Sequence, residues 1–353
     1  MSDSTDLLSA AERVEAGADL SAAEAAAAAH ALAETGVDAA LKERFLTAFA
    51  AKGETGPEVG YFAATFRGLA RDPGVEDWAG RAIDVCGTGG DKQGTFNIST
   101  VVALILASAG VPVFKHGNRS ITSSCGSADL LQALGVPLEI DADLARHSLE
   151  ELNFVFFFAP AYHPAFKEIM PVRKALAARG QRTVFNILGP LINPGRPAFQ
   201  LMGVFAESWV APLAEALHAL GLQGGYVAHG RLPDGGGMDE ISCATQNRTA
   251  GFGRNRGDDE VWAATRHGLP ECDRSVLAGG GVEDNVRLLE AILQGDAPAG
   301  LVDSILLNAA LALRIQGRVS SMEEGLDLAR EQLQGGGVAA LARKMQTFYQ
   351  HDT

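Results

Sequence analysis

The chain has 353 residues, of which 43 are acidic and 29 basic, so its formal net charge is −14. Hydrophobic residues make up 47 %, which excludes a disordered chain, and 4 cysteines are too few for a disulfide-rich scaffold. The acidity argues against a nucleic-acid partner, because contacts to a phosphodiester backbone need a basic surface. It leaves room for a small anionic ligand in a local basic pocket. The length predicts two domains, at about 100–200 residues per domain.

Targeting and membrane signals are not evident in the sequence. The first six residues, MSDSTD, lack the positive charge of a secretory signal. The apolar runs at 101–114 and 154–161 are shorter than the roughly 18–20 residues that span a bilayer. The four cysteines are far apart and form no C-x-x-C pair. We therefore expect free thiols in a cytoplasmic protein without a membrane partner.

The first 75 residues have only helical patterns. Ser21 begins a capping box ahead of an alanine-rich helix, which we expect to end in a left-handed cap at Gly36. A second helix is predicted over 39–51, where apolar side chains recur at helical spacing. A third begins after Thr55, with proline in its first turn. These patterns predict a packed helical bundle that carries no chemistry of its own.

After residue 71 the pattern changes to strands that alternate with helices. The predicted strands cover residues 82–86, 111–114, 138–140 and 154–158. The predicted helices lie between them, over residues 98–109, 127–134 and 143–152. Continuous apolar strands are typical of a parallel sheet covered on both faces. We therefore predict an α/β fold in which a small all-helical N-terminal domain accompanies a larger α/β domain with a mostly parallel central sheet.

The remainder of the chain repeats both patterns. Residues 163–191 are helical again, which would return the chain to the first domain. Further strands are predicted over 201–205 and 226–229, and late helices over 301–315, 322–333 and 338–349.

A glycine-rich loop follows the strand predicted over 82–86. Residues 84–91 have the sequence DVCGTGGD, which matches neither the dinucleotide GxGxxG motif nor the P-loop. Its glycines lack Cβ atoms, so consecutive N–H groups can approach an anion closely. The next helix begins near Asn97, and a helix start is a second anion-binding feature. Alone the loop is equally compatible with a plain βα turn, but the combination predicts phosphate binding.

Polar side chains gather after the strand predicted over 111–114. Residues 115–123 have the sequence KHGNRSITS, and CGSAD follows at 125–129. Open parallel sheets bind ligands at the carboxyl ends of their strands. A solvated turn has no need of lysine, histidine, asparagine and arginine together, so we predict a ligand site. Ser127 is expected both to cap the following helix and to bind a phosphate.

Two adjacent carboxylates, Asp239 and Glu240, follow a glycine-rich loop just past the strand predicted over 226–229. Alone such a pair is most often a solvated surface feature. Mg²⁺ prefers oxygen ligands and is usually held by one or two carboxylates together with substrate phosphates. Beside a polyphosphate site, the pair is the predicted metal anchor.

These segments together resemble the anthranilate phosphoribosyltransferase family. The resemblance extends from about residue 17 to residue 348 and rests on motifs that occur in the same order: 84–100, 115–129, 163–173, 182–194, 237–240 and the late helix around 307–310. Each motif alone is unspecific, whereas the ordered set is specific.

The resemblance implies the third step of tryptophan biosynthesis, in which the amine of anthranilate attacks C1 of 5-phosphoribosyl 1-diphosphate (PRPP) and diphosphate leaves, with Mg²⁺ as cofactor. It also implies a helical domain made of residues 1–76 and about 163–195, which would form the contact of a homodimer. Residues 77–162 and 196–353 would form the PRPP-binding α/β domain. Both small molecules would bind between the domains.

Carried over residue by residue, the resemblance implies three overlapping sets of site residues. PRPP contacts are implied for Gly87, Gly90, Asp91, Thr95, Asn97, Ile98, Ser99, Thr100, Lys115, His116, Gly117, Asn118, Arg119, Ser120, Ile121, Thr122, Ser123 and Ser127. Metal positions are Ser99, Asp239 and Glu240. Anthranilate positions are Gly87, Asn118 and Arg173, with His116 and Pro190 nearby.

The expected chemistry needs no strong general base. Cleavage of the C1–O bond transfers negative charge to the diphosphate, and an aromatic amine is largely unprotonated at neutral pH. A metal and fixed donors on the diphosphate are therefore the expected source of catalysis. Lys115, Asp239 and Glu240 would act electrostatically, and Arg173 would hold the anthranilate carboxylate.

Three segments depart from the family pattern. The segment 174–181 is about three residues longer than usual, and this difference bears most directly on the role expected for Arg173. Ser124 and Cys125 stand where the family commonly has a longer polar residue and serine. Residues 231–238 form a longer, glycine-rich loop that we expect to be mobile.

Two other functions remain as alternatives. A pyrimidine nucleoside phosphorylase would share the fold, but it would need no Asp-Glu metal pair. A non-catalytic relative that binds nucleic acid would lack the GTGGD loop and would have a basic face.

Overall fold

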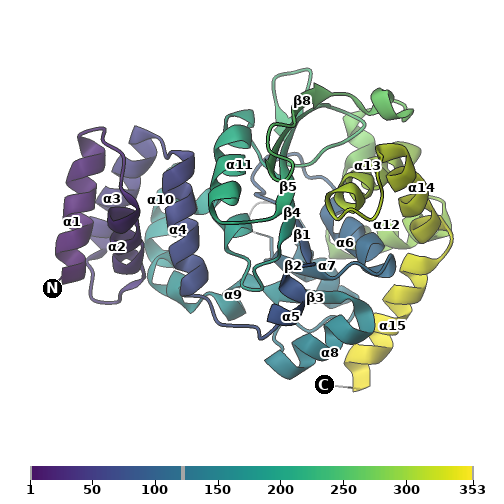
Figure 1. Cartoon of the computed structure of the whole chain (residues 1–353), viewed down its shortest axis with the longest axis horizontal. Coiled ribbons are helices and arrows are strands. Elements are labelled where there is room, and N and C mark those ends of the chain that lie inside the picture. Colours follow the sequence, from purple (N-terminus) through teal and green to yellow (C-terminus); the bar gives the residue numbers. More distant parts are fainter. Residues whose placement is uncertain (1, 121–123, 352–353) are drawn as a thin grey trace.

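The computed structural model describes residues 2–120 and 124–351 of the chain. As predicted, the described residues before position 80 form helices only. These are α1 (Ser2–Glu15), α2 (Ala22–Ala33), α3 (Ala39–Lys52), α4 (Gly56–Gly68) and the short α5 (Glu76–Ala79). Helices α1–α4 form a bundle at one end of the molecule, and the sheet with its covering helices forms the rest (Figure 1).

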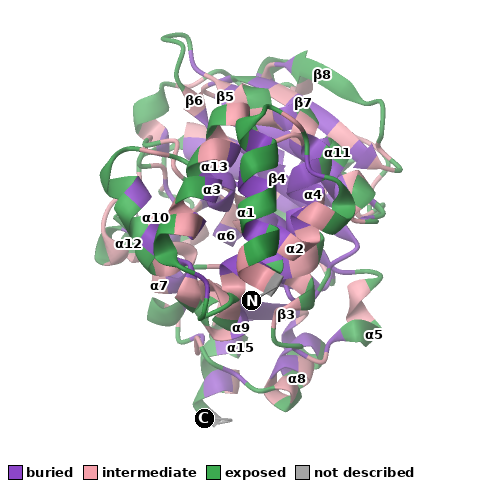
Figure 2. Ribbon diagram, turned by 90° about the vertical axis from the view of Figure 1, so that its left-hand side faces the viewer, coloured by how far each residue is buried: buried purple, intermediate pink, exposed green. Residues whose placement is uncertain are grey.

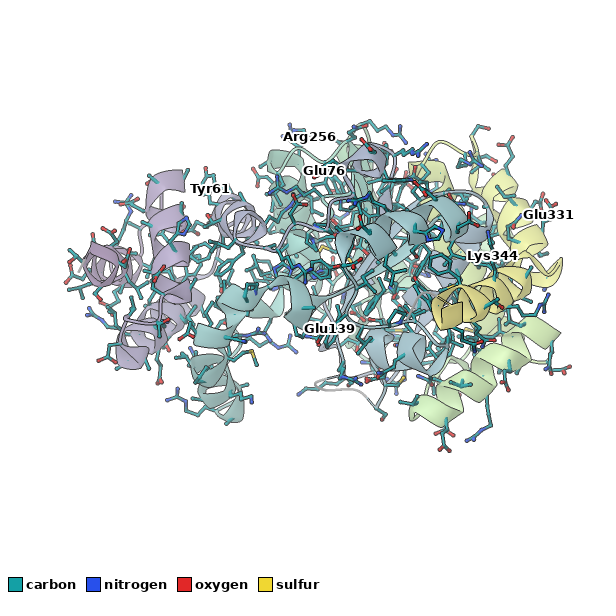
Figure 3. The ribbon with its side chains drawn as sticks, turned by 90° about the horizontal axis from the view of Figure 1, so that it is seen from below. Tyr61, Glu76, Glu139, Arg256, Glu331 and Lys344 are labelled. Carbon is teal, nitrogen blue, oxygen red and sulfur yellow. The ribbon has the colours of Figure 1, made fainter. Side chains whose placement is uncertain are left out.

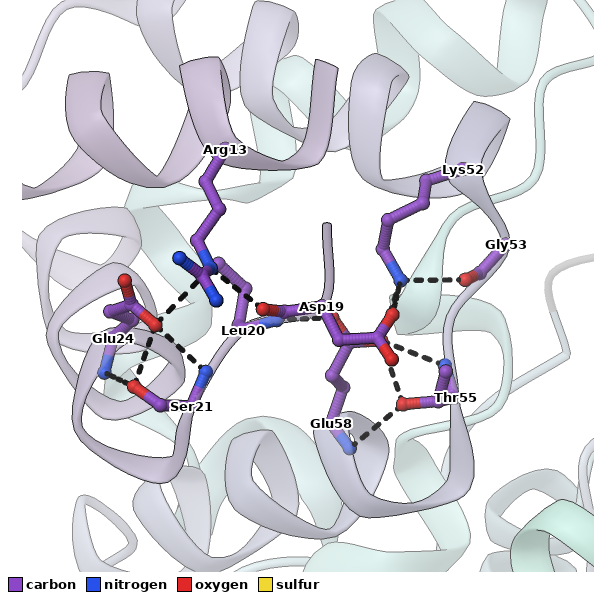
Figure 4. A network of polar contacts seen from close by, with 9 residues as sticks. All are labelled: Arg13, Asp19, Leu20, Ser21, Glu24, Lys52, Gly53, Thr55 and Glu58. Carbon is purple, nitrogen blue, oxygen red and sulfur yellow. Dashed lines mark hydrogen bonds and ion pairs between the residues drawn. The ribbon is translucent and has the colours of Figure 1, made fainter. Parts of the chain in front are cut away.

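Capping boxes begin two of the bundle helices and differ in burial (Figure 4). At the start of α2, Ser21 and Glu24 exchange the predicted hydrogen bonds near the surface. At the start of α4, the equivalent Glu58 is only 1 % exposed. Its carboxylate accepts hydrogen bonds from the Leu20 amide at 2.8 Å, from the Thr55 amide at 2.9 Å and from Lys52 Nζ at 2.9 Å. Glu58 therefore joins α4 to the end of α3 and to the α1–α2 connection.

A later segment of the chain packs against the bundle. It contains α10 (Met170–Ala178) and short 3₁₀ helices at Pro164–Glu168, Val184–Asn186 and Gly189–Ile192. Val172 and Leu188 are buried in the same hydrophobic cluster as Phe45 and Phe62 of the bundle. The predicted helical pattern of this segment is confirmed. The assignment of 1–76 and 163–195 to one domain stays a prediction, because the same cluster continues into the sheet region.

Within the described residues the sheet has eight strands, in the order β3-β2-β1-β4-β5-β7-β8 with β6 beside β5. The first five, β1 to β5, pair in parallel, and β6 to β8 are antiparallel. The predicted mostly parallel sheet is thus confirmed. The strands are β1 (Ile83–Gly87), β2 (Val113–Gly117), β3 (Phe154–Phe158), β4 (Phe199–Gly203), β5 (Gly224–Arg231), β6 (Gly237–Met238), β7 (Gln246–Gly253) and β8 (Asp259–Trp262).

Helices cover both faces of this sheet, which explains why its parallel strands are largely apolar and buried along almost their whole length. Leu201 on β4 belongs to a cluster with α6 and α13, whereas the next residue, Met202, belongs to the cluster with α11 and the bundle. Figure 2 shows β4 as buried, behind the largely exposed α1. The remaining helices are α6 (Ile98–Ser108), α7 (Ser127–Ala133), α8 (Ala142–Leu152), α9 (Ala159–Tyr162), α11 (Val210–Ala219), α12 (Val282–Gln294), α13 (Ala299–Ile315), α14 (Met322–Gln334) and α15 (Gly337–His351).

The long axis of the molecule runs from the bundle to the C-terminal helices. Figure 3 shows Tyr61 on the bundle, and Glu331 and Lys344 at the far end of the α/β part. Among the described residues, no single helix is long and apolar enough to cross a membrane, and α12 and α13 reach that length only as a pair bent by 82°. All four cysteines are free thiols, as predicted.

Two local predictions are wrong. Residues 138–140 form no strand, because β3 ends the sheet on that side and no strand lies beyond it. Two apolar residues around Glu139 are too short a pattern to distinguish a strand from a buried connection. Gly36 does not cap α2, since the helix ends at Ala33 and Glu34 already has an extended backbone.

The antiparallel strands β7 and β8 were not predicted. Strand β7 has the sequence QNRTAGFG, whose polar residues and glycines have low strand propensity. These residues form a strand because they pair along the whole of β5, from Gly224 opposite Gly253 to Arg231 opposite Gln246.

The two capping boxes give a matched test of burial. Glu58→Ala would leave the Leu20 and Thr55 amides without their acceptor and Lys52 without its buried partner, so we expect a loss of about 3–5 kcal/mol in the free energy of unfolding. Glu24→Ala, in the exposed box, should cost at most about 1 kcal/mol. Urea titrations measure both values. Equal losses would show that the buried network does not stabilise the bundle.

Candidate active site

The site lies where β1, β2 and β4 end, at the carboxyl edge of the parallel sheet. Gly87 at the end of β1 is in register with Gly203 at the end of β4. Asp239 packs against both glycines. A Cβ on Gly87 would lie 2.3 Å from Asp239 Oδ2, and a Cβ on Gly203 would lie 1.5 Å from the Asp239 carbonyl oxygen. Only glycine at these two positions lets the acidic segment reach the edge of the sheet.

Asp239 also holds the glycine-rich loop that follows β1. The Gly89 amide donates to Asp239 Oδ2 at 2.6 Å, and the Asp239 amide donates to Asp91 Oδ2 at 3.3 Å. Gly89 and Gly90 have φ values of +66° and +81°, which side chains with a Cβ rarely adopt. The loop thus has one defined backbone path beside the two carboxylates.

Lys115 lies at the centre of this edge, on β2. Its ammonium donates to the Val85 carbonyl at 2.8 Å and to Ser99 Oγ at 3.3 Å. The Ser99 amide in turn donates to Glu240 Oε1 at 3.2 Å. Burial lowers the pKa of Lys115, and the nearby Asp84 opposes that shift. The predicted residues Lys115, Ser99 and Glu240 therefore form one connected cluster.

The carboxylates of this cluster repel one another. Burial, and then repulsion from Asp239 and Asp91, raises the pKa of Glu240 well above its usual range. Burial and repulsion from Asp91 raise the pKa of Asp239 to about 7. Glu240 Oε2 is buried and has no hydrogen-bond partner within the described residues. A divalent cation would remove both costs, so the donor set fits Mg²⁺.

The protein alone would not complete such a metal site. Within 2–120 and 124–351, no three His, Cys, Asp or Glu side chains are arranged to hold a metal ion. Mg²⁺ usually keeps several waters and binds one or two carboxylates together with substrate phosphates. The arrangement therefore suits a metal that arrives with a phosphorylated ligand.

The start of α6 has fewer free donors than the sequence indicates. The Ile98 amide donates to the Phe96 carbonyl and the Thr100 amide to the Asn97 carbonyl. The Thr100 hydroxyl is buried without a described partner. The Asn97 side chain donates to the Cys125 carbonyl at 3.2 Å, and Thr95 pairs with Ala278 in an isolated bridge. This helix start therefore holds neighbouring loops together in the structure.

The loop after β2 is held mainly by Asp129. Its carboxylate accepts from the Ser120 amide at 3.1 Å, from the Gly126 amide at 2.9 Å and from Arg119 at 2.8 Å. Arg119, predicted to contact PRPP, is thus paired with an acid and also donates to Gln132. The predicted positions Ile121, Thr122 and Ser123 lie outside the described residues.

Ser127 does not cap α7, because Gly126 is the N-cap residue. Its hydroxyl instead lies beside Gly117, where a Cβ would come within 2.2 Å of it. The Asn118 side chain accepts from the Arg119 amide, and its carbonyl accepts from the Ala128 amide. Residues 117–118 therefore bring the end of β2 against the start of α7.

Two buried histidines lie side by side between β2 and the returning helical segment. His116 Nε2 and His163 Nε2 are 3.2 Å apart. Burial lowers the pKa of His163 to about 4 and that of His116 well below its usual range. Both rings are therefore neutral at physiological pH. In the hydrogen bond between them, one Nε2 carries the proton and the other accepts it. The sequence predicted His116 at this site, whereas the contact of His163 with His116 becomes visible only in the fold.

Arg173 lies in the first part of α10 with its guanidinium beside two aromatic rings that also contact each other. Its Cζ is 5.8 Å from the centroid of Phe166 and 5.3 Å from that of Phe185. One nitrogen donates to the Phe185 carbonyl at 3.3 Å. No described carboxylate pairs with this arginine. An unpaired cation with a planar fork is suited to a carboxylate ligand.

The longer segment at 174–181 extends α10 at its other end. The helix continues to Ala178, and Gly180, with φ of +74°, ends it as the Gln181 amide returns to the Leu176 carbonyl. The additional residues therefore lie beyond Arg173 and leave its helical turn intact. The long segment 231–238 likewise forms a hairpin between β5 and β6, and its mobility stays a prediction.

Arg182 and Phe205 are contacts of the glycine-rich loop that sequence reasoning missed. Arg182 donates to the Gly90 carbonyl at 2.8 Å, and its guanidinium lies 3.8 Å from the centroid of Phe205. The family motif contains Arg182, but its contact joins positions 92 residues apart, which spacing cannot reveal. Pro190, expected near anthranilate, has its carbonyl bonded to Gln200.

Residues 79–339 match the glycosyl transferase family, a/b domain. The chain belongs to this family and is a phosphoribosyltransferase enzyme.

Within this class, the chain belongs to the anthranilate phosphoribosyltransferase family. It is 38 % identical over 336 residues to the enzyme of that name from Natronomonas pharaonis, covering 95 % of this chain and 98 % of that relative. It also resembles the crystal structure of the anthranilate phosphoribosyltransferase from Thermus thermophilus, with 37 % identity, a TM-score of 0.87 and coverage of 97 % and 99 %.

A more distant likeness concerns the fold alone. The Saccharomyces cerevisiae anthranilate phosphoribosyltransferase, solved in complex with PRPP and Mg, is 23 % identical, with a TM-score of 0.83 and coverage of 98 % of each chain.

The buried His163 should make stability depend on pH. Its pKa is about 4 in the folded protein, below the ordinary 6.5, so only the unfolded chain takes up its proton as the pH falls from 6.5 toward 4. Between pH 7 and 4.5 the wild type should therefore lose about 2–3 kcal/mol more free energy of unfolding than His163→Gln. Urea titrations at the two pH values measure the difference. The exposed His147→Gln is the control, and identical pH dependence in all three proteins would contradict the assignment.

Proposed function

We propose that this chain transfers the phosphoribosyl group of PRPP to the amine of anthranilate, the third step of tryptophan biosynthesis. The C1–O bond to the diphosphate breaks, a C1–N bond forms, and the amine loses a proton. The observation that carries the proposal is the convergence of the glycine-rich loop, Lys115 and the Asp239–Glu240 pair at one edge of the sheet. Family membership supports it further, as does Arg173, which pairs with no carboxylate of the described residues.

The PRPP end of the reaction would use the glycine-rich loop and Lys115. The ammonium of Lys115 is fixed by the Val85 carbonyl and the Ser99 hydroxyl, so its position is set before a ligand arrives. A preorganised cation stabilises the charge that develops on a leaving diphosphate without further reorganisation. Loop glycines would let backbone N–H groups approach the phosphate oxygens.

Asp239 and Glu240 would hold Mg²⁺, with the hydroxyl of Ser99 nearby. When bound, this ion would supply positive charge to the diphosphate as the C1–O bond breaks. The unpartnered Oε2 of Glu240 and the raised pKa values of both carboxylates support this role, because each reflects a negative charge that lacks compensation.

Anthranilate would bind through its carboxylate to Arg173. The rings of Phe166 and Phe185 keep the guanidinium partly shielded from water, which strengthens an ion pair with a carboxylate. No residue acts as a strong base in this scheme. His116 and His163 are neutral and orient each other, so positioning and electrostatics would carry the reaction.

The alternatives are less well supported. A nucleoside phosphorylase would need no metal pair, so it would not explain two adjacent buried carboxylates, Asp239 and Glu240, whose repulsion raises the pKa of Glu240. A nucleic-acid-binding relative is disfavoured by the net charge of −14 and by the intact GTGGD loop.

We infer further that the protein is a cytoplasmic homodimer joined through its helical bundle. A groove of about 450 Å³ between α1 and α3 is lined by Ala40, Thr47, Ala48 and Ala51 together with the charged side chains of Glu15, Glu43 and Arg44. Small side chains allow helices of a second copy to approach closely. Light scattering on the purified protein should give twice the mass of 36.9 kDa, and Ala48→Arg should lower it toward one copy. A single-copy mass for the wild type would contradict the proposal.

The activity itself is tested by the formation of fluorescent N-(5-phosphoribosyl)anthranilate from PRPP, anthranilate and Mg²⁺. The wild type should turn over, and Asp239→Asn with Glu240→Gln should lose about 100-fold or more in kcat/KM, because the metal anchor is removed.

The exposed Asp234, at the tip of the β5–β6 hairpin, provides the control. Asp234→Asn should keep wild-type turnover. Absence of product from the wild type would refute the proposed function, and full activity of the double variant would refute the role of the carboxylates.

A further inference from the structure

Arg182 joins the returning helical segment to the glycine-rich loop. It follows α10 and precedes the 3₁₀ helix at Val184–Asn186, so it belongs to the segment that packs on the bundle. Its side chain nevertheless crosses to the α/β part. There it donates to the Gly90 carbonyl at 2.8 Å and stacks on Phe205 at 3.8 Å from the ring centroid. Among the described residues, no carboxylate pairs with Arg182.

Phe205 is itself fixed to the same loop. Its amide donates to Thr88 Oγ1 at 3.1 Å, and the Thr88 amide donates to the Gly203 carbonyl at 3.0 Å. The ring is partly buried against the hydrophobic cluster that contains Val204 and α11. Arg182 therefore contacts the loop directly at Gly90, and it stacks on Phe205, whose backbone is bonded to the loop at Thr88. These two points of attachment lie on either side of Gly89.

The opposite side of the loop is held by Asp239, through the Gly89 amide at 2.6 Å. The carbonyl of Gly90 and the amide of Asp91 share one peptide plane and point in opposite directions. The hydrogen bond from Arg182 thus determines where the Asp91 amide points. Glycines at positive φ have several backbone conformations available, so two external contacts are needed to select one.

We propose that Arg182 is a positioning residue, which holds the glycine-rich loop in the conformation that receives the diphosphate of PRPP. It touches no substrate in this scheme and acts through Gly90. Since Arg173 lies on the helix just before it, the same segment would contact anthranilate at one end and organise the PRPP loop at the other. The inference rests on the proposed function for the identity of the ligands.

Lysine cannot replace Arg182 in this role. A guanidinium is planar, so it can stack on Phe205 while an N–H in its plane reaches Gly90, whereas an ammonium is a compact point charge. Arg182→Lys should therefore resemble Arg182→Ala more than the wild type. Phe205→Leu removes the stacked ring and leaves the hydrogen bond, whereas Phe205→Trp keeps an aromatic face.

The test separates the two substrates in steady-state kinetics. Arg182→Ala should raise the KM for PRPP about tenfold and change the KM for anthranilate less than about twofold. Phe205→Leu should raise the KM for PRPP about threefold, Phe205→Trp should restore it, and Phe205→Leu should add little to Arg182→Ala. Arg173→Ala should give the reverse pattern, a higher KM for anthranilate. Arg179→Ala, which removes an exposed arginine paired with Glu43 at the end of α10, is the matched control and should behave as the wild type.

Direct binding keeps this proposal separable from the proposed function. Calorimetry with PRPP and Mg²⁺, without anthranilate, should give a Kd about tenfold higher for Arg182→Ala than for the wild type. Wild-type PRPP binding without product formation would overturn the reaction and leave the positioning role in place. Equal PRPP affinity for Arg182→Ala and the wild type would overturn the positioning role. A loss of kcat at unchanged KM values, together with a lower melting temperature, would do the same, since it indicates a structural role only.

Discussion

The close approach of Asp239 to two strand ends is the constraint on which the site depends. Gly87 and Gly203 end neighbouring strands in register, and the absence of both Cβ atoms admits the acidic segment to the edge of the sheet. From there, Asp239 holds the Gly89 amide and Glu240 holds the Ser99 amide. A side chain at either glycine would displace the carboxylates, the loop and the start of α6 together. The geometry of the whole edge is therefore decided by the smallest residues in it.

The charges at this edge of the sheet explain how an acidic protein could bind an anionic ligand. Repulsion from Asp91 makes the ionisation of Asp239 and Glu240 more costly, Asp239 adds to that cost for Glu240, and Lys115 alone does not balance it. Such a cluster is destabilising by itself. Under the proposed function, the cluster would be stabilised when a cation and a polyphosphate bind together, because each ion then compensates a charge that the protein leaves uncompensated. The net charge argues against an extended polyanion as partner, whereas the local arrangement favours a small anionic ligand.

The parts of this structure that sequence could predict are those set by local chemistry. The capping box at Ser21, the helix start after Thr55, the apolar strands and the ordered motifs lie within short stretches, so their spacing carries the information. Residues 138–140 and β7 depend on whether a partner strand exists, and no pattern within them reveals that. The acidic partner of Arg119, and the amides already engaged at the start of α6, likewise become visible only in the fold. Motif membership identified the right segments and left open what each side chain contacts.

The segment around α10 explains how two substrates could share one site without sharing residues. Its first turn places Arg173 beside two aromatic rings, and Arg182, just after its last turn, contacts Gly90. The additional residues of this chain lie between these two arginines, at the exposed end of the helix, so their separation is set by a longer helix closed at Gly180. Stiff helical geometry carries this spacing better than a flexible loop would, since a helix fixes the distance between its ends. A change in the length of α10 would therefore move Arg173 relative to the glycine-rich loop, which under the proposed function would alter the affinities for both substrates at once.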